Sequence, residues 1–382
     1  MVAPVLGDPL VVGYYATWKK AQTEGVDFSK YTHINIAFAI PNADGTFTLD
    51  ESFALPEAVT MIRGKGAKVL ISIGGWTGSN LISAIMSDDT TNKKFLTSIV
   101  DYVKTNDLDG VDLDWEYPGK SGAKCNPFDE ANDTPNYLKF LQALRSELDT
   151  TFGEKKKLIT MAVYVAPFYV NGAPLTDVSE FAKVVDYAHL MQYDVNGSWL
   201  NLTGPNAPLN NDKENGAPFS FASAIDAWTG AKWPANQLTA GLAFYGRSTT
   251  TLEDMTKTPD NMYQNQSNVL PQGDSEDAVW ADTCDETDGF NGQWQWKHLR
   301  DQKVLTDPLT AAAPWVRTVD KTSNTPWLFN PEKKTFISYD DPDSIEAKIN
   351  YAASKGLAGA MVWAIYMDYN GELLDTLKLK WR

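Results

Sequence analysis

Eight short apolar runs, separated by longer stretches of mixed polarity, most constrain the fold of this chain. Most of the runs are almost continuously apolar, as expected for parallel strands that are covered on both faces. Several of the intervening stretches have the apolar periodicity of helices. A repeated strand–helix pattern predicts a parallel α/β protein, and eight repeats suit a closed (β/α)8 TIM barrel better than an open sheet. The predicted strands are 10–16, 33–39, 68–73, 110–116, 158–165, 187–193, 238–245 and 357–364, and the predicted helices are 56–65, 93–106, 134–151, 178–185 and 344–355.

The regular spacing breaks once, between the seventh and the eighth predicted strand. Residues 248–338 in this interval are rich in Asn, Asp, Thr and Trp. Near the end of the interval, two strand-like runs flank Pro331 and Glu332, which predicts a hairpin of residues 327–330 and 334–339. We therefore expect a small α+β insertion domain at 248–338, and a barrel made of residues 1–247 and 339–382.

The charge balance excludes several kinds of partner. Asp and Glu number 49 against 33 Lys and Arg, which gives a formal net charge of −16. Such a chain repels phosphate backbones, so nucleic acid is not an expected partner, and without a long basic run no polybasic membrane contact is expected. No apolar stretch approaches the length that spans a bilayer. We expect a monomer by default.

Neither a metal nor another cofactor is expected. Cys125 and Cys284 are the only cysteines, too few to staple a chain of this length, and no ligand cluster with metal-binding spacing accompanies them. Whether these two cysteines are paired stays open. Among the scattered histidines, His33 and His189 lie within apolar, strand-like runs, so we expect them to be core residues.

The N-terminal residues do not have the basic region and apolar stretch of a signal peptide. A processed secreted chain would begin in this way, and so would a cytosolic one. Asn-x-Ser/Thr triplets, the acceptor pattern for N-glycosylation, favour secretion mildly. They begin at Asn132, Asn196, Asn201 and Asn265.

The most informative segment is Asp109-Gly-Val-Asp-Leu-Asp-Trp-Glu-Tyr-Pro118. Side chains on a strand alternate between two faces, so Asp112, Asp114 and Glu116 share one face, and the apolar residues between them share the other. The acids must then point into the barrel, with Glu116 at the carboxyl end of the strand, where barrel enzymes place their chemistry. Close carboxyl groups share protons, which can keep one of them protonated near neutral pH for general acid catalysis. Asp109 has the opposite parity and is expected to serve structure.

Two other interpretations of this segment deserve comparison. A solvated acidic turn would leave the carboxylates exposed, but the strand alternation and the apolar neighbours argue against it. Stacked carboxylates could also bind magnesium or calcium, although no further acidic motif clearly completes an oxygen shell.

With these residues in view, the sequence resembles family 18 of the glycoside hydrolases, the chitinases, in the branch that carries an α+β insertion domain. The spacing Asp109-x-x-Asp112-x-Asp114-x-Glu116 resembles the family signature. Further matches follow in the family's order and cover nearly the whole chain, from Gly13 to Asp368. They are SIGGW at 72–76, MQYD at 191–194, GLAFYGR at 241–247, SYDDP at 338–342 and GAMVW at 359–363.

The resemblance implies hydrolysis of β-1,4 bonds between N-acetylglucosamine units of chitin and chitooligosaccharides. In this family the substrate's own acetamido group is the nucleophile, and the product anomer is retained. Glu116 would protonate the leaving oxygen and later activate water. Asp114 would hold the acetamido N–H and stabilise the oxazolinium intermediate, and Asp112 would share a proton with Asp114. Tyr193 would hydrogen-bond the acetamido carbonyl group.

The resemblance also implies a set of sugar-binding residues in a cleft walled by the insertion domain. Tyr14 and Ser72 would support Asp112, and Trp363 would form the hydrophobic floor under the distorted sugar. The remaining expected residues are Phe38 and Met191 in the same pocket, Trp76 and Trp199 stacked on the leaving-side sugars, and Asp194, Tyr245 and Arg247 as hydrogen-bonding groups. Core packing is the alternative for Phe38, Met191 and Trp363. We expect a secreted, extracellular enzyme whose signal peptide is absent from this sequence.

Three other functions stay open. A chitin-binding lectin on the same barrel usually lacks the proton donor, whereas Glu116 is present. An endoglycosidase that acts on N-linked glycans shares the barrel and the mechanism, although the insertion favours linear polymers. An acidic interaction protein without an active site would not require three acids in a row on one strand. The segments 119–132 and 201–218 have no assigned role.

Overall fold

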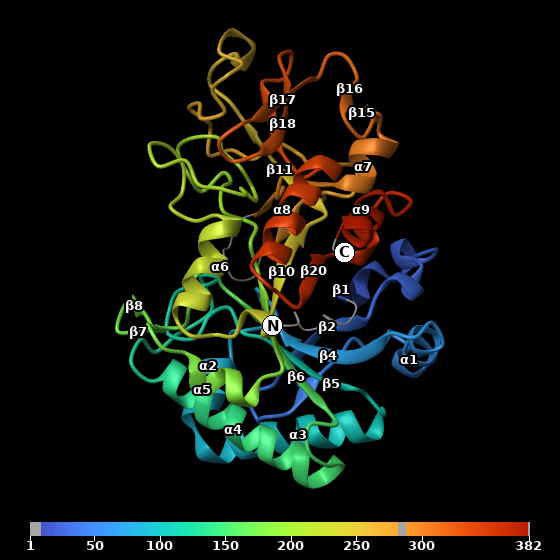
Figure 1. Ribbon diagram of the computed structural model, residues 1–382, viewed down its shortest axis with the longest axis vertical. Helices are drawn as coiled ribbons and strands as arrows, with labels where there is room; N and C mark the ends of the chain where they lie inside the picture. Colours follow the sequence, from blue (N-terminus) through green and yellow to red (C-terminus); the bar gives the residue numbers. More distant parts are fainter. Residues whose placement is uncertain (1–8, 282–287, 381–382) are drawn as a thin grey trace, which may run out of the picture. The chain divides into compact units, whose positions relative to one another are not determined.

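Eight parallel strands form a closed barrel in the computed structural model, which describes residues 9–281 and 288–380 (Figure 1). Neighbouring strands follow the order β1-β20-β10-β9-β6-β5-β4-β2, and β1 also pairs with β2, so the sheet closes on itself. The predicted TIM barrel is therefore confirmed. The barrel strands are β1 (Leu10–Ala16), β2 (His33–Pro41), β4 (Lys68–Gly74), β5 (Gly110–Asp114), β6 (Leu158–Val163), β9 (Tyr187–Leu190), β10 (Leu238–Ala243) and β20 (Gly359–Trp363).

By internal contacts the chain divides into two compact units. One consists of Met1–Leu190, Ala227–Ala240 and Lys355–Met361, and the other of Met191–Asp226, Gly241–Ser354 and Val362–Arg382. Every barrel strand has residues in the first unit. The second unit contains the segments that follow β9, β10 and β20, together with the insertion.

Several barrel strands end earlier than the sequence predicted. β5 ends at Asp114 and β9 at Leu190, so Glu116 and Tyr193 lie beyond their strands. At β5 the reason is local. The N–H of Glu116 donates to the Ser79 hydroxyl oxygen at 3.0 Å, so a side chain satisfies this backbone group. The predicted structural role of Asp109 fits its contacts, since its carboxylate accepts from the Val69 N–H at 2.8 Å.

Helices follow most barrel strands at the expected positions. In the first unit, α4 shows how the sequence specifies one of them. Its buried face repeats at helical spacing along Tyr137, Leu141, Leu144 and Leu148, which places one stripe of the helix in the core. The helices are α1 (Leu55–Arg63), α2 (Ile82–Ser87), α3 (Asp89–Thr105), α4 (Asp133–Phe152), α5 (Ser179–Val184), α6 (Phe221–Gly230), α7 (Trp296–Asp301), α8 (Pro342–Ser354) and α9 (Glu372–Lys380). None of the described helices combines the length and apolar character needed to cross a bilayer.

The insertion between β10 and β20 is built on a five-stranded antiparallel sheet in the order β14-β11-β19-β18-β17. The predicted hairpin is confirmed, because β18 and β19 pair antiparallel from Trp327 opposite Ser338 to Asn330 opposite Thr335. Buried Met255, Met262 and Tyr263 pack with aromatic residues of these two strands. The sheet strands are β11 (Tyr245–Thr250), β14 (Gln293–Gln295), β17 (Val316–Asp320), β18 (Thr325–Asn330) and β19 (Thr335–Ser338); the short pairs are β12 (Trp280–Ala281) with β13 (Asp288–Gly289) and β15 (Leu305–Asp307) with β16 (Thr310–Ala311); elsewhere β3 (Phe47–Thr48) pairs with β2, and β7 (Tyr169–Val170) with β8 (Ala173–Pro174).

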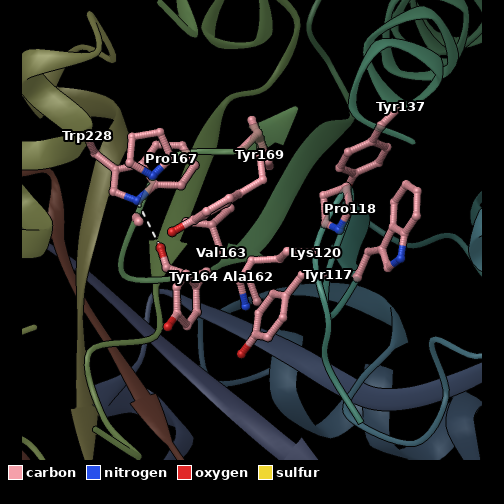
Figure 2. A pocket seen from close by; sticks show the side chains of 13 residues that line it. Tyr117, Pro118, Lys120, Tyr137, Ala162, Val163, Tyr164, Pro167, Tyr169 and Trp228 are labelled. Carbon is pink, nitrogen blue, oxygen red and sulfur yellow. Dashed lines mark hydrogen bonds between the residues drawn. The ribbon is translucent and has the colours of Figure 1, made fainter. Parts of the chain in front are cut away.

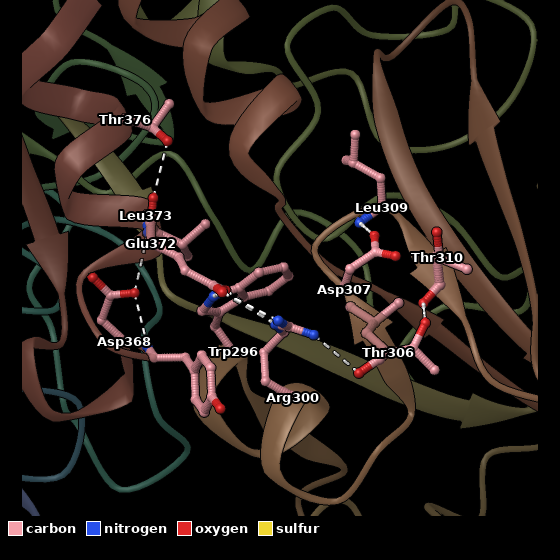
Figure 3. A network of polar contacts seen from close by, with 12 residues as sticks. Trp296, Arg300, Thr306, Asp307, Leu309, Thr310, Asp368, Glu372, Leu373 and Thr376 are labelled. Carbon is pink, nitrogen blue, oxygen red and sulfur yellow. Dashed lines mark hydrogen bonds and ion pairs between the residues drawn. The ribbon is translucent and has the colours of Figure 1, made fainter.

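A polar network joins α7 to α9 within the second unit (Figure 3). The Glu372 carboxylate accepts from the Trp296 indole N–H at 3.0 Å and from the Arg300 guanidinium group at 3.0 Å. Asp368 accepts from the N–H groups of Leu373 and Leu374 near the start of α9. The network therefore anchors the last described helix to the insertion.

Candidate active site

The three acids of the β5 segment are buried in a row. Asp112 is 0% exposed, Asp114 4% and Glu116 8%. The residues between them are buried on the opposite face, where Trp115 meets the Tyr137 ring edge-on at 5.1 Å. The solvated-turn interpretation is wrong, because no member of the row is exposed.

Asp112 is surrounded by hydroxyl groups from three other barrel strands. Its Oδ2 accepts from Tyr14 of β1 at 2.8 Å and from Ser72 of β4 at 2.7 Å, and its Oδ1 accepts from Thr160 of β6 at 2.6 Å. Hydrogen bonds to an ionised acceptor are stronger than those between neutral groups. The closed barrel brings these strands together, so the expected support of Asp112 by Tyr14 and Ser72 has a direct structural basis.

Asp114 lacks comparable partners. Its Oδ1 is buried and has no hydrogen-bond partner among the described residues. Burial, then the charges of Glu116 and Asp112, raise the pKa of Asp114 well above its ordinary value. Burial also raises the pKa of Asp112, but the hydroxyl donors oppose that rise. Asp112 thus has three hydroxyl donors that favour its charged form, whereas no hydrogen bond among the described residues offsets the burial of Asp114 Oδ1.

Side chains of two other residues form hydrogen bonds with the backbone groups of Glu116. Its carbonyl oxygen accepts from the Asn126 side-chain amide at 3.0 Å, and the same amide donates to the Trp76 carbonyl oxygen at 2.7 Å. The Ser79 hydroxyl group accepts from the Glu116 N–H and donates to the Gly75 carbonyl oxygen at 2.8 Å. These contacts fix the backbone at Glu116.

A neutral histidine lies beside Asp112. His189 Nε2 lies 3.7 Å from Asp112 Oδ1, and its Nδ1 lies 2.7 Å from the Thr239 hydroxyl oxygen. Burial lowers the pKa of His189 to about 3. The imidazole ring is therefore uncharged at neutral pH, and His189 is the core residue that the sequence predicted, as is buried His33.

The expected aromatic residues of the first unit lie near the ends of their strands. Phe38 is half-buried, and its ring is tilted against Tyr14 with centroids 6.4 Å apart. Trp76 is 42% exposed and meets the Tyr117 ring edge-on at 6.5 Å. Gly75, at a φ of +86°, leaves room for Phe38, because an added Cβ would lie 2.8 Å from that ring.

Five other expected site residues form a cluster within the second unit. Asp194 Oδ1 accepts from the Tyr245 hydroxyl group at 2.7 Å and from Arg247 Nε at 2.6 Å. The Arg247 guanidinium group lies 5.5 Å from the ring centre of Trp199, whose side chain is 56% exposed. Tyr193 meets Tyr245 edge-on, with centroids 6.0 Å apart. Rings, a carboxylate and a guanidinium group of this kind could stack on and hydrogen-bond a sugar.

Met191 and Trp363 are half-buried, the first directly after β9 and the second at the end of β20. No group of three or more His, Cys, Asp or Glu residues in the described ranges could hold a metal ion. Cys284 lies outside the described residues, so whether it pairs with Cys125 stays an open question, as in the sequence analysis.

Three residues that the sequence did not single out belong to this site: Ser79, Asn126 and Thr160. Thr160 could have been found, because it is a polar residue within a predicted apolar strand. Ser79 and Asn126 lie in loops, where no periodicity marks a side chain that turns back to the backbone.

Comparisons with known proteins show which family the chain resembles. The family described as glycosyl hydrolases family 18 matches residues 10–368. A chitinase-like effector of Moniliophthora roreri is 35% identical, over 97% of this chain and 93% of that protein. Chitinase A1 of Niallia circulans is 30% identical, over 96% of this chain and 58% of that protein.

A solved structure supports the same relationship. The crystal structure of a chitinase from Rhizomucor miehei covers 98% of this chain and all of its own, with a TM-score of 0.89 and 35% identity. The match thus extends through the barrel and the insertion. With an ordered set of motifs, the closed barrel and a family match over nearly its whole length, the chain belongs to family 18 of the glycosyl hydrolases.

Proposed function

We propose that this protein is a chitinase that hydrolyses β-1,4 bonds between N-acetylglucosamine units of chitin and chitooligosaccharides by a retaining, substrate-assisted mechanism. The observation that carries the proposal is the buried row of Asp112, Asp114 and Glu116, in which the last acid follows the end of its strand. The similarity to proteins named as chitinases supports the same substrate class.

Glu116 is the proposed general acid and base. In the first step its carboxyl proton passes to the glycosidic oxygen, while the acetamido oxygen of the substrate attacks the anomeric carbon. The bond to the leaving sugar breaks, and an oxazolinium ion forms. In the second step the Glu116 carboxylate takes a proton from water, which opens the oxazolinium ring with retention of the anomer.

The two aspartates stabilise the charge that this chemistry creates. A proton shared by Asp112 and Asp114 stays with Asp112 as the acetamido N–H approaches, which leaves the Asp114 carboxylate to accept that N–H. The hydroxyl groups of Tyr14, Ser72 and Thr160 keep Asp112 in place throughout. Preorganised polar groups of this kind do not have to reorient in the transition state.

The remaining predicted residues have proposed roles in binding. Tyr193 orients the acetamido carbonyl group, and Asp194, Tyr245 and Arg247 hydrogen-bond the sugar. Trp363 supplies the floor under the distorted sugar, Phe38 and Met191 line the same pocket, and Trp76 and Trp199 stack on the leaving-side sugars. The protein acts as a secreted monomer in this proposal, and neither a metal nor a cofactor takes part.

The deciding experiment is mass-spectrometric product analysis of a chitin hexamer incubated with the parent protein and with Glu116→Gln. The amide keeps the shape of the carboxyl group but has no proton to donate. We expect dimers or trimers from the parent, and at least about a hundredfold slower cleavage by the variant. Equal turnover by both proteins would remove Glu116 from its proposed role.

A chitin-binding protein without turnover is the second candidate, because one similar relative is named a chitinase-like effector. The same experiment separates the two functions. If the parent leaves the hexamer intact but binds it in calorimetry, the protein is a binding member of the family. If the parent neither cleaves nor binds it, both proposals fail.

A further inference from the structure

Lys120 lies shortly after the catalytic strand, inside a cage of tyrosine rings (Figure 2). Its ammonium nitrogen is 4.0 Å from the ring centre of Tyr164, 4.4 Å from that of Tyr117 and 5.8 Å from that of Tyr169. All three distances are within the range in which the face of an aromatic ring attracts a cation. Three rings therefore hold this ammonium group.

The cage is only partly open to water. The rings of Tyr117 and Tyr164 lie 5.0 Å apart at an angle of 59°, and the Lys120 side chain extends beside both of them (Figure 2). Lys120 also donates to the Ser121 carbonyl oxygen at 3.0 Å. Burial lowers the pKa of Lys120 to about 8, although the charge of Glu116 opposes this shift. The amine is thus still mostly charged at neutral pH.

Tyr117 connects the cage to the proposed acid. Burial raises the pKa of Tyr117 well above its ordinary value, and the charge of Glu116 and a hydrogen bond between the two side chains act in the same direction. The phenol therefore keeps its proton over the working pH range and can donate it to the Glu116 carboxylate. Tyr117 thus has the Lys120 ammonium group against its ring and the Glu116 carboxyl group at its hydroxyl group.

We infer that Lys120 is a positioning residue for Glu116, in that its ammonium group holds the Tyr117 ring in place and supplies the positive charge that offsets the neighbouring aspartates. This inference rests on the proposed function. The second step of the reaction needs Glu116 as a carboxylate, while Asp112 and Asp114 favour its protonated form. A cation near Glu116 favours the ionised form by simple Coulomb attraction.

The first test compares Lys120→Met with Lys120→Arg. Methionine keeps an unbranched apolar side chain but loses the charge, whereas arginine keeps a cation that can stack on the same rings. The measurement is kcat/KM for a chitin tetramer as a function of pH. For Lys120→Met we expect the basic limb of the profile to move up by about half a pH unit, since the loss of a nearby cation stabilises the protonated acid. For Lys120→Arg we expect the basic limb to lie at the same pH as in the parent protein.

The titratable groups that face this pair from the surrounding elements are Asp112 and Asp114 of β5, Tyr117 of the following loop, Tyr164 after β6 and Tyr169 of β7. All of them are unchanged in both variants, so a selective shift in Lys120→Met reports the lysine charge. A profile of Lys120→Met that coincides with that of the parent overturns the inference, and so does an equal shift in both variants.

A second measurement depends on neither turnover nor a lysine substitution. The rate at which acetic anhydride acetylates Lys120 is measured against pH by mass spectrometry, in the parent and in Glu116→Gln. We expect the midpoint of labelling at lower pH in Glu116→Gln, because the amine loses a neighbouring negative charge. Equal midpoints overturn the inference. If the parent fails to cleave chitin, the proposed function falls separately, and the labelling still decides whether the two charges interact.

Discussion

The hydroxyl group of Tyr14 donates a hydrogen bond of 2.8 Å to Oδ2 of Asp112, although 98 positions separate the two residues in the sequence. Barrel closure creates this contact, because β1 and β5 both direct these side chains inward. We expect Tyr14→Phe to lower kcat on a chitin tetramer about tenfold with little change in KM, since a hydrogen bond to a charged group contributes about 1.5–3 kcal/mol. Steady-state kinetics measure both constants.

Tyr15 provides the matched control for this prediction. It is the next residue and is also buried, at 4% exposed against 1% for Tyr14, but it stacks on Phe28 instead of meeting the acids. Tyr15→Phe should leave kcat unchanged. A similar loss in both variants would mean that tyrosine-to-phenylalanine exchange disturbs the barrel and not the acid row.

Asp114→Asn should reduce kcat at least about a hundredfold, because an amide cannot carry the negative charge that stabilises the oxazolinium ion. Stopped assays with a chitin tetramer measure this loss. Asp109→Asn is the control from the same segment, since Asp109 bonds Arg63 and the Val69 backbone instead of facing the acids. That control should lower the melting temperature and spare kcat. An unaffected rate in Asp114→Asn would contradict the substrate-assisted mechanism.

Acid should destabilise this protein through its buried histidines. Burial lowers the pKa of His189 to about 3 and that of His33 to about 4, whereas an imidazole in the unfolded chain takes up a proton near pH 6.5. Between these values the unfolded state binds more protons, so the free energy of unfolding falls as the pH drops below about 6.5. Urea titrations at pH 7 and pH 4 should show this fall.

Replacing either histidine by Gln should reduce the difference between the two pH values, whatever it does to the stability at pH 7. The two substitutions test the prediction at two sites, because His33 and His189 lie on different strands. If both variants keep the full pH dependence of the parent, acid sensitivity has another origin.

A buried ion pair in the second unit should make a large contribution to stability. Lys348 Nζ lies 2.6 Å from Asp340 Oδ1, and both side chains are 1% exposed. Lys348→Met should lower the free energy of unfolding by about 3–5 kcal/mol, since it leaves a buried carboxylate without its cation. Lys183→Met is the control, because Lys183 pairs with Glu180 at the surface, and it should cost less than about 1 kcal/mol. Equal effects in denaturant titrations would contradict this prediction.

The parts of the fold that follow from periodicity could be predicted from the sequence. The eight barrel runs begin within a few residues of the observed strands, and β1 matches at both ends. The short helices α2, α6 and α7 were not predicted, although the similarly short α1 and α5 were. The α9 helix was missed at the end of the chain.

Some residues of the candidate site could also be predicted from the sequence, and others could not. The row Asp112, Asp114 and Glu116 follows from strand parity, and the structure buries all three. Thr160 joins this row only through the register between β5 and β6, which pairs it with Asp112. Register between strands that are distant in sequence is a property of the closed barrel, so a single strand does not reveal it.

The two hydrogen bonds of the Asn126 amide restrict how this protein can evolve. The segment 119–132 had no assigned role in the sequence analysis. Because Asn126 ties it to the backbone of both Trp76 and Glu116, an insertion next to Asn126 would move the proton donor as well as the loop. Diversification through this loop is therefore expected between Asn126 and Asn132, because Lys120 and Asn126 lie on the side of the loop that supports Glu116.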